Sequence, residues 1–226
     1  MHIPDGLMAP AVAGVGWIIA LILLATTFKV LNKRMDDRQI TLMAVLAAGI
    51  FVAQMLNFPI GGGTTGHLLG AALATIILGP LAGILILTTI LTIQALVFGD
   101  GGLTALGLNI LNMAIIGSLV AWYAYIALRK WNINAAVFAA AFSSVFAAAL
   151  AAAAQLAVSH SLSGGVYGIS GAIAFPAMAA FHLLIGIGEA IITSSVVLYL
   201  ARVSPGMLKL PKLTLATFKK EAIADA

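Results

Sequence analysis

Cysteine is absent from this chain of 226 residues, and charged side chains are scarce. Without thiols the protein cannot form a disulfide, bind a metal through thiolate or use a cysteine nucleophile, so a bound metal must be held by nitrogen or oxygen. Charged residues make up 8% of the chain, whereas soluble domains contain about a quarter. The hydrophobic 62% exceeds what one core can bury, which indicates that lipid solvates part of the surface.

Two catalytic signatures are also missing. The chain has no H-E-x-x-H zinc protease motif and no G-x-x-x-x-G-K-[ST] phosphate loop, so it is not expected to be a zinc protease or to hydrolyse ATP itself. The first basic residue, Lys29, follows the first apolar run instead of preceding it. That order is the reverse of a secretory signal. We therefore expect a mature N-terminus that keeps Met1, because His2 is too bulky for the usual aminopeptidase.

Long apolar runs make up most of the sequence. A membrane-spanning helix needs about 20 apolar residues. The expected spans are Ala11–Phe28, Ile40–Leu56, His67–Leu78, Leu81–Phe98, Leu103–Leu128, Ala135–Val158 and Gly171–Ala201. The third is short and is expected to enter at an angle from the glycine-rich loop Asn57–Gly66. The sequence thus predicts an all-α membrane protein, one integral membrane domain over residues 1–226, with a bundle of about seven transmembrane helices.

The cations predict the orientation of this bundle. If the N-terminus lies outside, alternation of the seven spans places all 11 Lys and Arg residues on the inside, including the tail 202–226. Cytoplasmic loops carry such an excess of positive charge. We therefore expect a multi-pass membrane protein, in contact with the lipid bilayer and not with nucleic acid, whose tail is cytoplasmic. The four histidines fall in the outer half.

The first two residues form a potential chelate. The α-amine of Met1, the backbone amide nitrogen of His2 and the His2 imidazole can close two adjacent small rings around one cation. Ni(II) or Cu(II), which can displace an amide proton, would then have three nitrogens in a plane, and a fourth would complete the square geometry that these ions favour.

A second histidine follows a glycine-rich loop. His67 ends the run Gly61-Gly62-Gly63-Thr64-Thr65-Gly66, where glycines allow tight turns and close approach of the backbone. An imidazole at the end of such a loop can reach another element and supply the fourth nitrogen. A capped helix start with an incidental histidine is the alternative, and it stays open at this point.

Three segments together resemble the NikM/CbiM family, the substrate-capture (S) components of energy-coupling factor transporters for nickel and cobalt. They are Met1-His2-Ile3-Pro4-Asp5-Gly6, the loop from Gly62 to Gly70, and Phe98-Gly99-Asp100-Gly101-Gly102-Leu103-Thr104-Ala105-Leu106-Gly107 with Asn109, Asn112 and Met113. The resemblance implies a bundle with one more N-terminal helix than vitamin-binding S components. It also implies that residues 1–10 insert into the bundle and that Met1, His2 and His67 bind the ion.

The same resemblance implies the cargo and the partners. The glycine loop and Gly99-Asp100-Gly101-Gly102 look more like the nickel branch, which favours nickel(II) as the transported substrate over cobalt(II). The implied partners are a transmembrane (T) component, two ABC ATPase subunits that hydrolyse the ATP, and a small accessory N component on a separate chain. This chain is then a non-enzymatic subunit in a prokaryotic inner (plasma) membrane, and it captures the cation at the extracytoplasmic face.

Four further residues are weaker candidates for supporting or coupling roles. Pro4-Asp5-Gly6 is a turn signal, and Asp5 is a candidate for orienting an imidazole. Thr65 belongs to the histidine loop. His182 and Glu189 lie seven residues apart, on one helix face, where they either pair with Asn109, Asn112 or Gln94, or couple to a partner. His160 is expected to be solvated in a polar loop, Ser159–Gly168.

Two other functions are weighed. Gly168-Ile169-Ser170-Gly171 matches the G-x-S-G of intramembrane serine proteases, with His182 as the base, but a Ser–His dyad normally joins different elements. A stand-alone metal channel is the other possibility, although no ring of charges or carbonyl motif suggests a filter.

Overall fold

The structure is a computed structural model that describes residues 1–31, 35–56, 58–61, 64–208 and 214. The α-helices are α1 (Pro10–Leu31), α2 (Asp37–Met55), α3 (Ala71–Leu78), α4 (Pro80–Ile93), α5 (Leu106–Asn109), α6 (Gly117–Leu128), α7 (Ile133–Leu162), α8 (Gly171–Val203) and α9 (Pro205–Leu208). Two π-helical segments, η1 (Gln94–Phe98) and η2 (Ile110–Ile116), continue α4 and join α5 to α6. The strands β1 (Phe58–Gly61) and β2 (Thr64–Gly66) form an antiparallel hairpin.

Within the described residues, six helices are long and apolar enough to cross a membrane. They are Pro10–Leu31, Asp37–Met55, Pro80–Phe98, Leu106–Leu128, Ile133–Leu162 and Gly171–Val203. Each overlaps one of the predicted spans, because long apolar runs without interior breaks favour helices in lipid. The helical membrane fold is therefore confirmed.

The predicted third span differs from the structure. His67–Leu78 is helical only from Ala71, and the 8 residues of α3 extend about 12 Å, less than half of a bilayer core. The hairpin β1–β2 precedes it, where an all-α chain was expected. Gly70 and Gly79 flank α3 with φ of 76° and 98°, a region that favours glycine, so the helix is bounded at both ends.

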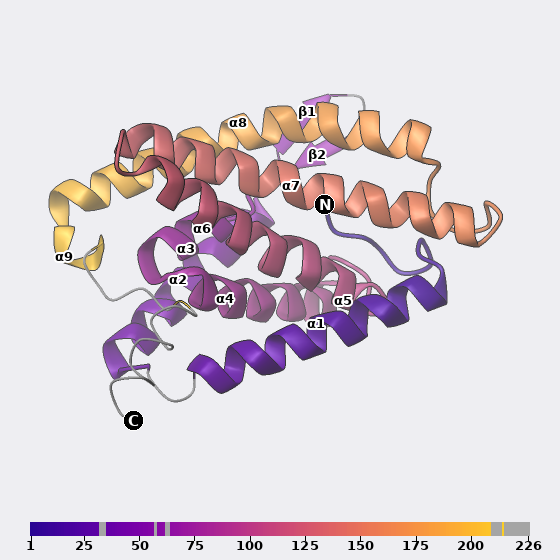
Figure 1. Cartoon of the computed structure of the whole chain (residues 1–226), viewed down its shortest axis with the longest axis horizontal. Coiled ribbons are helices and arrows are strands. Elements are labelled where there is room, and N and C mark those ends of the chain that lie inside the picture. The colour runs from indigo at the N-terminus through magenta and orange to yellow at the C-terminus, as the bar shows by residue number, and fades with distance from the viewer. Residues whose placement is uncertain (32–34, 57, 62–63, 209–213, 215–226) are drawn as a thin grey trace.

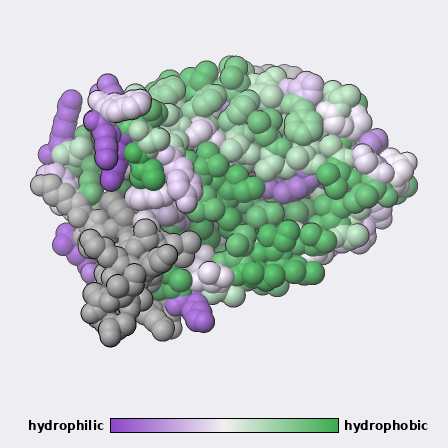
Figure 2. All heavy atoms as spheres, viewed as in Figure 1, coloured by the Kyte–Doolittle hydropathy of each residue, from purple (hydrophilic) through white to green (hydrophobic). Residues whose placement is uncertain are grey.

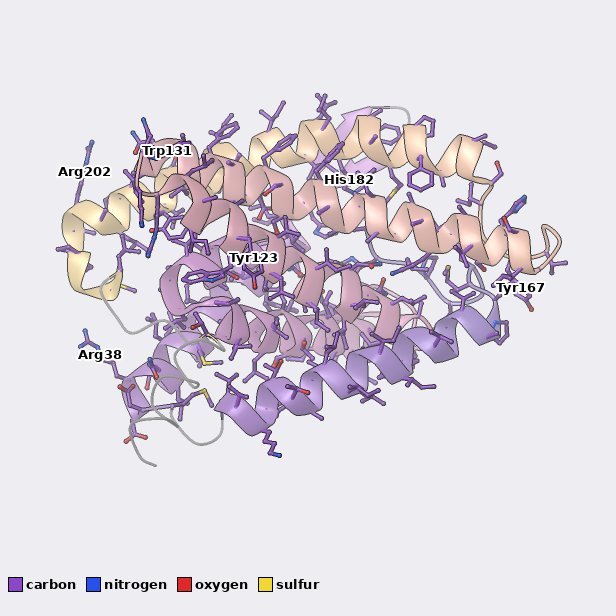
Figure 3. All side chains as sticks on the ribbon, viewed as in Figure 1. Arg38, Tyr123, Trp131, Tyr167, His182 and Arg202 are labelled. Carbon is purple, nitrogen blue, oxygen red and sulfur yellow. The ribbon has the colours of Figure 1, made fainter. Side chains whose placement is uncertain are left out.

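The helices run along the long axis of an elongated molecule (Figure 1). One end, which we call the basic end, holds the α6–α7 connection, α9, Arg38, Trp131 and Arg202, and Tyr167 lies at the opposite end (Figure 3). Figure 2 shows an apolar surface between these ends, and exposed side chains such as Ile22 and Val45 contribute to it. This distribution fits a bundle surrounded by lipid.

The short helix α3 lies in the core, where seven of its 8 residues are buried. Next to it, α7 presents a stripe of buried alanines to its neighbours, among them Ala140, Ala148 and Ala152. Small residues allow helix backbones to approach closely. The N-terminal segment, residues 1–9, enters this bundle at the opposite end and reaches its middle (Figure 1).

Candidate metal centre

Ile3 fixes the inner part of the N-terminal segment. Its backbone N–H donates to Asn109 Oδ1 over 2.9 Å, and its carbonyl accepts from Asn109 Nδ2 over 3.1 Å. The same carbonyl accepts from the Gly102 N–H over 2.9 Å. An extended strand has no partners of its own, and buried backbone groups must be hydrogen-bonded. One asparagine side chain therefore replaces a neighbouring strand and sets the depth of insertion.

Asp5 attaches the turn at Pro4-Asp5-Gly6 to the loop before α5. Its carboxylate accepts hydrogen bonds from the N–H groups of Leu103 and Thr104, over 3.0 and 2.7 Å, and from Thr104 Oγ1 over 2.5 Å. These bonds, the Thr104 hydroxyl first, lower the pKa of Asp5. The turn is as predicted, but the Asp5 carboxylate is engaged by this loop and not by an imidazole. The carboxylate beside His2 is that of Asp100.

The end of α7 covers the outer part of the segment. The Ala9 N–H donates to Ser159 Oγ over 2.8 Å, and the Leu7 carbonyl accepts from the Gly168 N–H over 2.7 Å. The prediction of a polar loop from Ser159 is wrong, because α7 continues to Leu162. His160 accordingly lies in the last turn of this helix, half-buried, and not in a solvated loop.

Met1, His2 and His67 converge in the middle of the bundle. The rings of His2 and His67 stack with their centroids 4.9 Å apart and their planes 24° apart. The Met1 amine is buried, and burial lowers its pKa, which the nearby Asp100 opposes. Burial also lowers the pKa of His2, reinforced by His67 and the amine, and that of His67, reinforced by the amine. Neutral nitrogens, the form that binds metals, are thereby favoured.

A hydrogen bond of the His67 ring indicates its tautomer, and the His2 ring contacts a carboxylate. His67 Nδ1 lies 2.8 Å from the Leu68 carbonyl, which can only accept, so this nitrogen carries the proton and Nε2 keeps a lone pair. His2 Nδ1 lies 3.3 Å from Asp100 Oδ1. Among the described residues, His2 Nε2 is buried without a hydrogen-bond partner. Chelation by the N-terminus uses His2 Nδ1, so a cation would replace the Asp100 contact.

The buried pair on α8 has other partners than those expected. His182 Nδ1 contacts the Met178 carbonyl at 2.9 Å, and the Glu189 carboxylate accepts from the Leu69 and Gly70 N–H groups. Both side chains are buried on one face of α8, as predicted. The predicted pairing with amides of neighbouring helices is wrong, since those amides bind elsewhere. Asn109 bonds Ile3, Asn112 bonds Gln155, and Gln94 bonds Gln54.

Two remaining candidates are settled by position. Ser170 precedes α8 and His182 lies 12 residues further along that helix, about 18 Å at the rise of an α-helix, so they form no catalytic dyad. Thr65 lies in β2, and its side chain lies outside the described part of the chain.

The contacts of Asp100 with His2 and of Asn109 with Ile3 were not predicted from the sequence. Asp100 and Asn109 were visible in the motif that follows α4, but only their contacts with His2 and Ile3 reveal what they do. In the described residues no three His, Cys, Asp or Glu side chains converge as a metal site would require.

Fold and centre together define a class: a multi-pass helical membrane protein whose own N-terminal segment is inserted beside two stacked imidazoles. Residues 2–207 match the family model described as "Cobalt uptake substrate-specific transmembrane region", CbiM. The chain is 41% identical over 210 residues to a putative fused nickel transport protein NikMN of Archaeoglobus fulgidus, covering 92% of this chain and 68% of the relative. It is 38% identical to a putative metal transport protein of Haloquadratum walsbyi, covering 92% and 93%.

A solved structure is similar throughout. A crystal structure of a transition metal transporter superposes with a TM-score of 0.83 at 39% identity, covering 90% of this chain and 93% of that one. The chain belongs to the CbiM family, and it is a transmembrane component of nickel and cobalt transport. The resemblance read from the sequence is thus confirmed at the level of the family.

Proposed function

We propose that this protein captures Ni(II), with Co(II) as the second candidate, in a planar site of four nitrogens. The donors are the Met1 amine, the ionised His2 amide, His2 Nδ1 and His67 Nε2. The observation that supports the proposal is the buried amine beside two stacked rings. His67 Nε2 has its lone pair free of the proton, because Nδ1 donates to Leu68.

The donor set determines which cations are accepted. Mg(II) and Ca(II) require oxygen ligands, and Zn(II) prefers a tetrahedron that a planar chelate cannot offer. Ionisation of a backbone amide adds a strong donor in the plane. Cu(II) fits the same geometry, so rejection of copper must come from its low availability or from the size of the site.

Transport requires more than capture. In this proposal the protein acts at the extracytoplasmic face as the S component of an energy-coupling factor importer, with a T component, two ATPases and a small N component as partners. The relatives named as nickel transport proteins support the cargo. Release requires that bonds between the cation and its four nitrogen ligands break. Reorientation of the whole subunit during ATP hydrolysis would break them.

The decisive test uses chain variants with matched controls. An extension of several residues before Met1 converts its free amine into a peptide nitrogen, and His67→Ala removes the fourth nitrogen, so both should abolish tight nickel binding in a bundle that still folds. His160→Ala is the control, since His160 lies at the end of α7 and not beside His2. Equilibrium competition with a chelator measures the affinities. Unchanged nickel affinity after the N-terminal extension would contradict the proposal.

A further inference from the structure

A buried carboxylate on α8 holds the backbone that follows His67. Glu189 Oε2 accepts from the Leu69 N–H over 2.5 Å, and Glu189 Oε1 accepts from the Gly70 N–H over 2.7 Å. The side chain is 0% exposed and belongs to a helix long and apolar enough to cross the membrane. Ionisable side chains at such positions are costly and usually functional. The two hydrogen bonds therefore call for a role beyond the packing of α8.

The carboxylate and the His67 ring contact the same peptide group from its two ends. His67 Nδ1 lies 2.8 Å from the Leu68 carbonyl oxygen. The N–H of that peptide belongs to Leu69, and it is the one that donates to Glu189 Oε2. A trans peptide is planar, so its C=O and its N–H point in opposite directions. Fixing the N–H therefore also fixes the direction of the carbonyl that the imidazole contacts.

The next peptide is held in the same way. Its N–H is that of Gly70, which donates to Glu189 Oε1. Its carbonyl is that of Leu69, which accepts from Gln54 Nε2 over 2.7 Å. Gly70 has a φ of 76°, and a Cβ added there would lie 2.5 Å from Ile50 Cγ2. Both peptides are therefore confined between α2 and α8, and Glu189 is the acceptor that they share.

We propose that Glu189 is a positioning residue for His67, and that it acts through the peptide between Leu68 and Leu69. The inference rests on the proposed nickel site, in which His67 supplies the fourth nitrogen. The outer partner of a metal-ligating histidine fixes the orientation of its ring. Here that partner is a backbone carbonyl, and the carboxylate orients the carbonyl without touching the ring. A purely structural role, in which Glu189 only joins α8 to the start of α3, is the alternative.

The first measurement is nickel affinity of the full chain. Glu189→Gln keeps the size of the side chain, but its NH2 group would face a backbone N–H, and two donors cannot bond to each other. The peptide should shift, and loss of such outer support costs roughly 10- to 100-fold in affinity. Glu189→Asp keeps two acceptors on a shorter side chain, so a smaller loss is expected. Thr193→Val is the matched control, because Thr193 is buried one turn further along α8, and its affinity should equal that of the wild type.

The second measurement separates positioning from stability. At saturating nickel, the d–d band of His67→Ala should lie at longer wavelength than that of the wild type, because a weaker donor replaces the imidazole. Glu189→Gln should move the band in the same direction, and Thr193→Val should leave it in place. Thermal unfolding of the metal-free variants is recorded beside it. Lower stability of Glu189→Gln with unchanged affinity and band would overturn the inference. If that variant does not fold, unchanged affinity and band in Glu189→Asp would do so.

Failure of the proposed site gives a different pattern. A wild type that binds no nickel, or whose band does not respond to His67→Ala, contradicts the planar site itself. A planar wild type that responds to His67→Ala but not to the Glu189 variants contradicts only the role of Glu189.

Discussion

The donors at the centre are groups whose charged forms are suppressed by their surroundings. Burial is the first cause of the lowered pKa values of the Met1 amine, His2 and His67, and proximity of these groups adds to it. Each group therefore favours the neutral state while it lies in the bundle. The neutral amine and imidazoles offer lone pairs to a cation. Only the His2 backbone amide must still lose a proton when the cation binds.

The lowered pKa values predict how insertion depends on pH. In the unfolded chain the amine and the imidazoles have pKa values near 8.0 and 6.5. In the bundle their pKa values are lower, because burial disfavours the protonated forms. The stability of the inserted segment is therefore complete above these ordinary values and is lost as the pH falls below them, towards the lowered values. Hydrogen exchange of residues 1–9 in the metal-free protein should accelerate over this range.

Nickel affinity should fall over the same range, because the proton and the cation compete for the same nitrogens. Helical content, followed by circular dichroism, is the control and should stay constant. Exchange and affinity that do not change between pH 8.0 and pH 6.5 or below would contradict this assignment of the ligands.

At the scale of elements, the N-terminal segment depends on the loop before α5. An added Cβ on Gly102 would lie 2.3 Å from Asp5 N and 2.6 Å from the Pro4 carbonyl carbon, both backbone atoms. Gly102→Ala should therefore displace the segment and abolish nickel binding, while the helices remain folded. Nickel affinity and thermal unfolding together separate these two effects.

Gly49→Ala is the control for this substitution. Gly49 lies on α2, and an added Cβ would meet nothing within 4 Å. Its nickel affinity should match that of the wild type. Tight nickel binding by Gly102→Ala would show that the segment is held in some other way.

The sequence predicted the elements best where one physical signal dominates. The six long apolar runs became helices, because lipid leaves no other partner for the backbone. The stretch around His67 was harder, since glycines permit many conformations and the hairpin forms by pairing of β1 with β2. Likewise, the end of α7 at Leu162 could not be predicted from serines, which occur in loops and in helices.

The centre was predictable only in part. Met1, His2 and His67 could be named because their chemistry is local or unusual, and the structure brings them together. The partners of Glu189 are backbone N–H groups 119 and 120 residues away, and no pattern in a single sequence indicates such a contact. The same holds for Asn109, whose side chain serves as a neighbouring strand for Ile3.

For the whole molecule, the charge distribution predicts an orientation in the membrane. The basic end should face the cytoplasm, by the rule that cytoplasmic loops carry the cations. Val166 and Trp131 are 76% and 85% exposed, and they lie in the connections α7–α8 and α6–α7 at opposite ends. Because the chain has no cysteine, single cysteines at these positions report on orientation without background.

Val166→Cys should react with an impermeant maleimide in intact cells, and Trp131→Cys only after the membrane is opened. The parent chain, which cannot react, is the control. The reverse pattern would place the N-terminal segment on the cytoplasmic side, and capture from outside would be contradicted.

The most direct test of the planar site is the electronic state of nickel in the full chain with its natural N-terminus. We expect one bound nickel per chain, a yellow d–d absorption band and a diamagnetic complex, because four nitrogens in a square favour low-spin Ni(II). A paramagnetic six-coordinate spectrum, or the same spectrum after an extension of several residues is placed before Met1, would contradict it.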